Sequence, residues 1–139
     1  MNSKSKGNIG EIAIAKEFIK FGWSVAFPFG DNERYDLIVD DGKNLKKVQV
    51  KYAGAKSQNN AWRCTCCSST NHTTNKKLSS YKDDVDIIAF YIADLDQCIM
   101  FNIDEIKDHK NIYVRKDIPK NNNKNVIYIK DHTFDNYIK

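Results

Sequence analysis

The clearest alternation of hydrophobic and polar positions lies between residues 35 and 52. Two runs, residues 35–39 and 45–51, are rich in β-forming residues and flank an Asp-Gly turn signal, which predicts an antiparallel hairpin. Side chains alternate between faces along a strand, so Gln49 and Lys51 share one polar face of the second run.

The length of the turn decides which residues of the two strands face each other. A two-residue turn at residues 41–42 pairs Asp36 with Lys47, whereas a loop two residues longer pairs Asp36 with Gln49. Both registers put Asp36 on the same face as Gln49 and Lys51, and both gather the hydrophobic residues on the other face. One carboxylate, one amide and one ammonium group therefore converge beside an apolar sheet.

The rest of the chain predicts one long helix and several short strands. Residues 3–21 form an amphipathic pattern with Ile14, Ala15 and Phe18 on one stripe, and Gly22 ends it. Residues 84–92 are almost continuously apolar after an acidic entry, as expected of a central strand. The other predicted elements are strands at 23–27, 61–66, 98–103, 112–114 and 126–129, a short helix at 104–106 and a helical turn within 133–139. The polar segments 67–80 and 120–125 are predicted to be loops.

Glu11 lies on the apolar stripe of the long helix and has two interpretations. Asn8 as N-cap and Glu11 three residues later form a capping-box-like pair. Alternatively, the helix delivers the Glu11 carboxylate to a metal site.

Asp36 facing Gln49-Val50-Lys51 resembles the core of the PD-(D/E)XK nucleases, in which an Asp on one strand faces an acid-x-Lys motif on the next, with Gln here at the acid position. The segments at residues 6–11, 27–32, 34–37 and 48–51 are similar to the group I intron-encoded homing endonucleases of this superfamily, which also carry Gln there. The resemblance runs from about Lys6 to Glu105 and implies a restriction-endonuclease-like fold of the α/β (α+β) class. Residues 1–139 would then form a single domain with a mixed central β-sheet flanked by helices.

The resemblance implies a metal-dependent endonuclease that hydrolyses phosphodiester bonds in double-stranded DNA. Glu11, Asp36, Gln49 and Lys51 are the candidate catalytic residues, and Glu11, Asp36, Gln49 and the carbonyl of Val50 are the candidate metal ligands. Oxygen ligands of this kind suit Mg2+, for which Mn2+ can substitute. A homo-oligomer, dimer or tetramer, is expected.

Other interpretations remain open at this point. In the simplest alternative, Asp36 and Lys51 form an ordinary cross-strand ion pair, and Gln49 is an exposed strand residue. The same core also serves a Holliday-junction-resolvase-like or repair nuclease, or a non-catalytic DNA-binding module that has lost its chemistry.

The charge distribution is compatible with a nucleic acid partner. The formal net charge is +4 and the isoelectric point is about 8.8. Arg34 is either a phosphate contact or a surface charge. The candidate DNA-binding residues are Lys6, Arg34, Lys56, Arg63, Lys76 and Lys77.

The four cysteines, Cys64, Cys66, Cys67 and Cys98, raise the question of a zinc site. Cys64 and Cys67 form a C-x-x-C, but strand alternation sends these two to opposite faces, which favours ordinary buried thiols.

The chain has no run of 18 apolar residues and a polar start, so no membrane partner and an intracellular location (cytoplasm or nucleoid) with reduced cysteines are expected.

Overall fold

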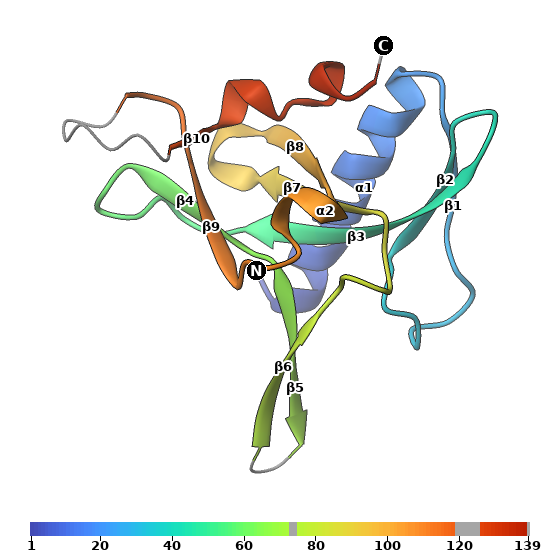
Figure 1. The fold of residues 1–139 in the computed structure, drawn as a ribbon, viewed down its shortest axis with the longest axis horizontal. Coiled ribbons are helices and arrows are strands. Elements are labelled where there is room, and N and C mark those ends of the chain that lie inside the picture. Colours follow the sequence, from blue (N-terminus) through green and yellow to red (C-terminus); the bar gives the residue numbers. More distant parts are fainter. Residues whose placement is uncertain (73–74, 119–125, 139) are drawn as a thin grey trace.

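The predicted hairpin lies at the centre of a five-stranded mixed sheet in the computed structural model, which describes residues 1–72, 75–118 and 126–138 (Figure 1). β3 pairs antiparallel with β2 on one side and parallel with β7 on the other. In spatial order the strands are β1 (Ser24–Ala26), β2 (Leu37–Asp40), β3 (Leu45–Ala53), β7 (Ile87–Ile92) and β8 (Gln97–Asn102). The mixed sheet and the central strand predicted from residues 84–92 are confirmed.

The hairpin adopts the longer of the two registers. Asp40 pairs with Leu45 and Leu37 with Val48, so Asp36, one residue before β2, lies level with Gln49. The backbone N–H of Asp36 still donates to the carbonyl of Val48 at 2.8 Å, which extends the ladder by one bond.

Two aspartates explain why the loop has four residues rather than two. Asp41 Oδ1 accepts hydrogen bonds from the backbone N–H groups of Lys43 and Asn44, both at 2.8 Å. Asp40 Oδ1 accepts from Gly42 N at 2.8 Å, and Gly42 adopts a φ of 94°, a conformation that glycine reaches without strain.

The long helix α1 (Ser3–Lys20) covers one face of this sheet. Its buried residues are Gly10, Ile14, Ala15 and Phe18, the stripe that the sequence predicts. Asn2 is the N-cap, and its side chain accepts from Ser5 N at 2.8 Å. Asn8 therefore lies inside the helix, and the prediction that Asn8 caps it is wrong because Asn2 supplies the same capping chemistry six residues earlier.

The opposite face of the sheet is covered by a small three-stranded sheet and a one-turn helix, α2 (Ile103–Ile106). Trp62, Phe90 and Phe101 are at most 4% exposed in the core between these layers. The strands of the small sheet are, in spatial order, β10 (Ile127–Tyr128), β9 (Asn111–Arg115) and β4 (Ala61–Thr65).

The polar segment 67–80 is a hairpin rather than a loop. β5 (Cys67–His72) pairs antiparallel with β6 (Asn75–Ser80), and the pair projects away from the rest of the chain (Figure 1). The prediction of a loop is wrong because the segment is rich in Ser, Thr and Asn, and its sequence shows no regular hydrophobic alternation that would reveal a strand.

Short 3-10 turns complete the described chain: η1 (Ala93–Leu95), η2 (Ile129–Asp131) and η3 (Phe134–Asn136). The last of these confirms the predicted turn near the C-terminus. The segment 120–125, predicted to be a loop, lies outside the described residues. Among the helices that are described, none is long and apolar enough to span a membrane.

Candidate active site

The candidate site forms where β2 stops and β3 continues. β2 begins at Leu37, opposite Val48, so the next part of β3 has no β2 residue to pair with on that side. The carboxylate of Asp36 takes that position, and its Oδ2 accepts a hydrogen bond from Val50 N at 2.8 Å. This bond anchors Asp36 at the edge of β3, between the two faces of the sheet.

Gln49 and Lys51 follow on the same strand and share a face, as the alternation predicts. Both side chains are half-buried. The Gln49 amide donates from Nε2 to the carbonyl oxygen of Val50 at 3.3 Å. Lys51 Nζ donates to the carbonyl of Cys67 at 3.4 Å and lies 5.1 Å from the centroid of the Tyr81 ring.

Glu11 approaches the site from α1, on the other face of the sheet. The helix packs against β3 next to Gly10, where an added Cβ would lie in ordinary van der Waals contact, 3.5 Å from Val50 Cγ1. Glu11 itself is half-buried. Burial raises the pKa of Glu11, and the negative charge of Asp36 raises this pKa further.

Asp36 is in a similar electrostatic situation. Burial raises the pKa of the Asp36 carboxyl, although the hydrogen bond from Val50 N and the charge of Lys51 both act to lower it. Burial is thus the largest cause of the raised pKa of both carboxyl groups, and their charged forms are both disfavoured.

The donors around this site fit a hard divalent cation. Carboxylate oxygens of Glu11 and Asp36, the amide oxygen of Gln49 and the carbonyl of Val50 are oxygen ligands of the type that Mg2+ prefers. Within the described residues no three His, Cys, Asp or Glu side chains come together as a potential metal cluster. With only two carboxylates, a cation here would complete its coordination with neutral oxygens, water or substrate phosphate.

Arg34 belongs to a network that sequence reasoning did not foresee. Its Nε lies 3.0 Å from Asp84 Oδ2, and its Nη2 donates to Ser68 Oγ at 3.0 Å and to the carbonyl of Ser80 at 3.2 Å. The guanidinium also lies 4.8 Å from the centroid of the buried Tyr81 ring. Arg34 thus ties the loop before Asp36 to the base of the β5–β6 hairpin, and Tyr81 lies against both Arg34 and Lys51.

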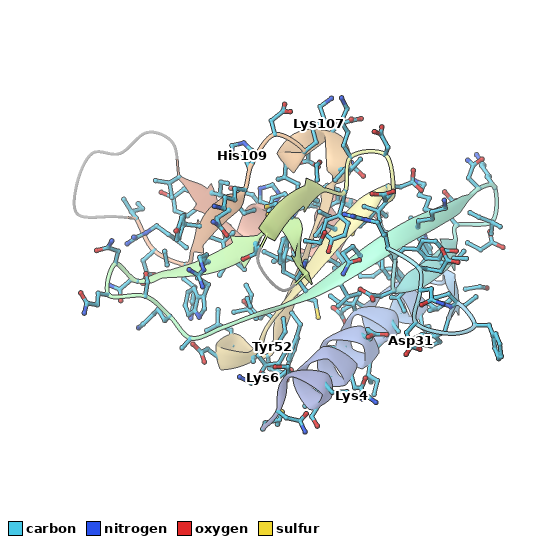
Figure 2. The ribbon with its side chains drawn as sticks, turned by 90° about the horizontal axis from the view of Figure 1, so that it is seen from below. Lys4, Lys6, Asp31, Tyr52, Lys107 and His109 are labelled. Carbon is cyan, nitrogen blue, oxygen red and sulfur yellow. The ribbon has the colours of Figure 1, made fainter. Side chains whose placement is uncertain are left out.

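Three of the other five cations predicted to contact DNA have described side chains, and all three are exposed. Lys6 is exposed near the start of α1, with its Nζ 5.8 Å from the Tyr52 ring centroid (Figure 2). Lys56 is exposed in the loop after β3, and Arg63 is exposed on β4. The side chains of the remaining two, Lys76 and Lys77, lie outside the described part of the structure.

The four cysteines form no disulfide in the described part of the chain. Cys64, Cys66 and Cys67 are buried and Cys98 is half-buried. Burial, with a smaller effect of Cys67, raises the pKa of Cys66 to about 11, and burial raises that of Cys98 to about 12.

A carboxylate pair and a lysine, placed where one strand of a mixed sheet ends and its neighbour continues, are typical of nucleases. The sequence profile of the PD-(D/E)XK endonuclease family matches residues 1–135, and the chain belongs to this family. The chain is therefore a nuclease by family, as the resemblance of its motifs implies.

Two further comparisons agree with this assignment. Protein 5.3 of Escherichia phage T7 is 29% identical over 116 residues, which cover 79% of this chain and 88% of the phage protein. The solved structure of a bacterial homing endonuclease, I-Ssp6803I, matches with a TM-score of 0.83 and 23% sequence identity, over 97% of this chain and 90% of that chain. This likeness confirms the restriction-endonuclease-like fold.

Proposed function

We propose that the protein is a metal-dependent endonuclease that hydrolyses phosphodiester bonds in double-stranded DNA. One observation carries this proposal: the Asp36 carboxylate is held by Val50 N where β2 ends and β3 continues, and Glu11 and Lys51 are close enough to interact with it electrostatically. The family match and the homing endonuclease fold support the same activity.

Glu11, Asp36, Gln49 and the Val50 carbonyl would hold Mg2+, or Mn2+ in its place. When bound, such a cation lowers the pKa of water and neutralises charge on the phosphoryl oxygens. Asp36 is prepared for this role because its hydrogen bond to Val50 N fixes the direction of the carboxylate before any ligand arrives.

Lys51 supplies a positive charge beside the carboxylates. Its ammonium group would stabilise the negative charge that develops on the phosphoryl group, or orient the attacking water. The Cys67 carbonyl and the Tyr81 ring hold Nζ without removing its charge, so the group is already in position when the substrate binds.

We also propose a homo-oligomer, dimer or tetramer, because two active sites would cut both strands of a duplex in a single binding event. α1 leaves Ile12 and Ile19 exposed by 67% and 60%, which gives the helix an apolar face away from the sheet. Sedimentation equilibrium would measure the state directly, and a monomer at micromolar concentration would contradict this part of the proposal.

The activity can be tested with a long linear genomic duplex and a synthetic four-way junction, each with Mg2+ and with EDTA. We expect Mg2+-dependent cutting of the linear duplex, and Asp36→Asn should cut at least ~100-fold more slowly while it still binds DNA. Cutting of the junction alone would instead indicate a resolvase-like enzyme. DNA binding without cutting of either substrate would indicate a non-catalytic module.

A further inference from the structure

A cavity lies directly beside Lys51, between the end of β3 and the strand β4. Its volume is about 410 Å³, and its lining includes Lys51, Arg63, Thr65, Phe90 and Tyr113. This volume is within the range of small-ligand pockets, which begins at about 300 Å³. Because Lys51 belongs to both, the cavity is continuous with the candidate active site.

The charges around this cavity favour an anion. Its lining contains two cations, Lys51 and Arg63, and no Asp or Glu. Arg63 also differs from the other two arginines of the chain. Arg34 is paired with Asp84, and Arg115 donates to backbone carbonyls, whereas Arg63 makes no hydrogen bond or ion pair within the described residues. Its guanidinium is available for a phosphate.

An aromatic side chain stands next to this arginine. Arg63 and Tyr113 are direct cross-strand partners of β4 and β9, so their side chains lie on the same face of the small sheet. Tyr113 is 53% exposed, and no ring of the described residues stacks on it. Exposed aromatic rings beside cations hold the nucleotides of single strands, and a ring of this kind beside a duplex can pack against a sugar of the backbone.

We propose that this cavity binds the nucleotide next to the scissile phosphate. Arg63 contacts the flanking phosphate, and Tyr113 packs against the sugar of the same nucleotide. This inference rests on the proposed function, because it assumes a DNA substrate whose scissile phosphate lies at Lys51. It adds a second contact point, which would fix the position of the cut relative to the bound strand.

The test measures binding of a fluorescent 30-base-pair duplex in the Asp36→Asn background, which prevents cutting. Arg63→Gln should weaken binding about tenfold and reduce the slope of log affinity against log salt by about one. Tyr113→Ala should weaken binding about tenfold, while Tyr113→Phe, which keeps the ring, should bind like the parent. Lys116→Gln is the charge-matched control, because Lys116 is exposed just beyond β9 and does not line the cavity.

A second measurement locates the contact. Duplexes that carry one neutral methylphosphonate at successive positions around the mapped cut should bind the parent more weakly at one flanking position, and Arg63→Gln should be insensitive there. If Arg63→Gln and Tyr113→Ala both bind like Lys116→Gln, the inference is wrong and the proposed function stands. If the parent itself binds no DNA, the proposed function fails and the inference falls with it.

Discussion

The side-chain amide of Gln49 donates a hydrogen bond to the backbone carbonyl oxygen of Val50 at 3.3 Å. The amide nitrogen is therefore turned toward one candidate metal ligand, which leaves the amide oxygen free to act as another. A glutamate at this position could not donate this bond. Gln49 thus provides a hydrogen-bond donor to the Val50 carbonyl. The neighbouring Asp36 carboxyl has a raised pKa because it is buried.

Gln49→Glu should bind Mg2+ or Mn2+ more tightly than the wild type in the absence of DNA, by about tenfold. The reason is that a carboxylate adds a full negative charge to a site that otherwise offers an uncharged oxygen. Calorimetric titration of each metal into both proteins measures the effect. Gln97→Glu is the control, since it adds the same charge at an exposed position on β8. Equal or weaker binding by Gln49→Glu would show that Gln49 does not touch the metal.

Lys51→Met should lower the rate of cleavage about 100-fold and weaken DNA binding by no more than about tenfold, the loss expected for one phosphate contact. The substitution keeps most of the side-chain length but removes the charge that stabilises the developing negative charge on the phosphoryl group. Single-turnover cleavage and equilibrium binding separate the two effects. Lys47→Met is the matched control, because Lys47 is exposed on the same strand and the same face. Cleavage by Lys51→Met at the wild-type rate would remove Lys51 from the catalytic residues.

The hairpin that carries the candidate site could be predicted because its signals are local. A period of two fixes which side chains share a face, and the hydrophobic set excludes a one-residue slip. This is why Asp36, Gln49 and Lys51 could be grouped before the structure was known. The choice between two even registers could not be made in the same way, because it depends on hydrogen bonds from Asp40 and Asp41 to the loop.

The features that sequence reasoning missed depend on long-range contacts or on weak local signals. Arg34 and Asp84 are 50 positions apart, and no periodicity links them. The β5–β6 ribbon pairs two polar segments whose sequence shows no regular hydrophobic alternation. Asn8 and Glu11 have the spacing of a capping box, but this spacing also occurs inside a helix, and only the position of the true cap at Asn2 decides between the two.

Arg34→Gln should lower the free energy of unfolding by about 1–3 kcal/mol. The substitution removes an ion pair with Asp84 and contacts with Ser80 and Tyr81 at the base of the hairpin. Urea denaturation measures the loss, and a double-mutant cycle with Asp84→Asn isolates the share of the ion pair. Lys82→Gln, an exposed neighbour, is the control. An unfolding free energy equal to that of the wild type would show that Arg34 is not a structural link.

The C-terminal part of the chain contains a half-buried histidine that should make stability depend on pH. His132 Nδ1 lies 2.7 Å from the hydroxyl of Tyr137, and its ring stacks on Phe101 with 4.2 Å between centroids. Burial lowers the pKa of His132 below its ordinary value of 6.5, although the charges of Glu105 and Asp131 act to raise it. The folded protein therefore keeps this imidazole neutral at a pH where the unfolded chain protonates it.

Between the ordinary pKa of 6.5 and the lower pKa of the folded state, the unfolded chain binds more protons than the folded protein. The contribution of His132 to stability is therefore fully present above about pH 6.5 and is lost as the pH falls through the pKa of the folded state. His132→Gln should remove this loss, so its unfolding free energy should change less than that of the wild type between pH 7.5 and about 5.5. Urea denaturation at several pH values measures both proteins, and the range stops before most carboxylates titrate. His109→Gln is the control, because His109 is exposed on the loop after α2 (Figure 2) and should leave the wild-type pH dependence in place. The same pH dependence in His132→Gln and in the wild type would mean that His132 is not the group responsible.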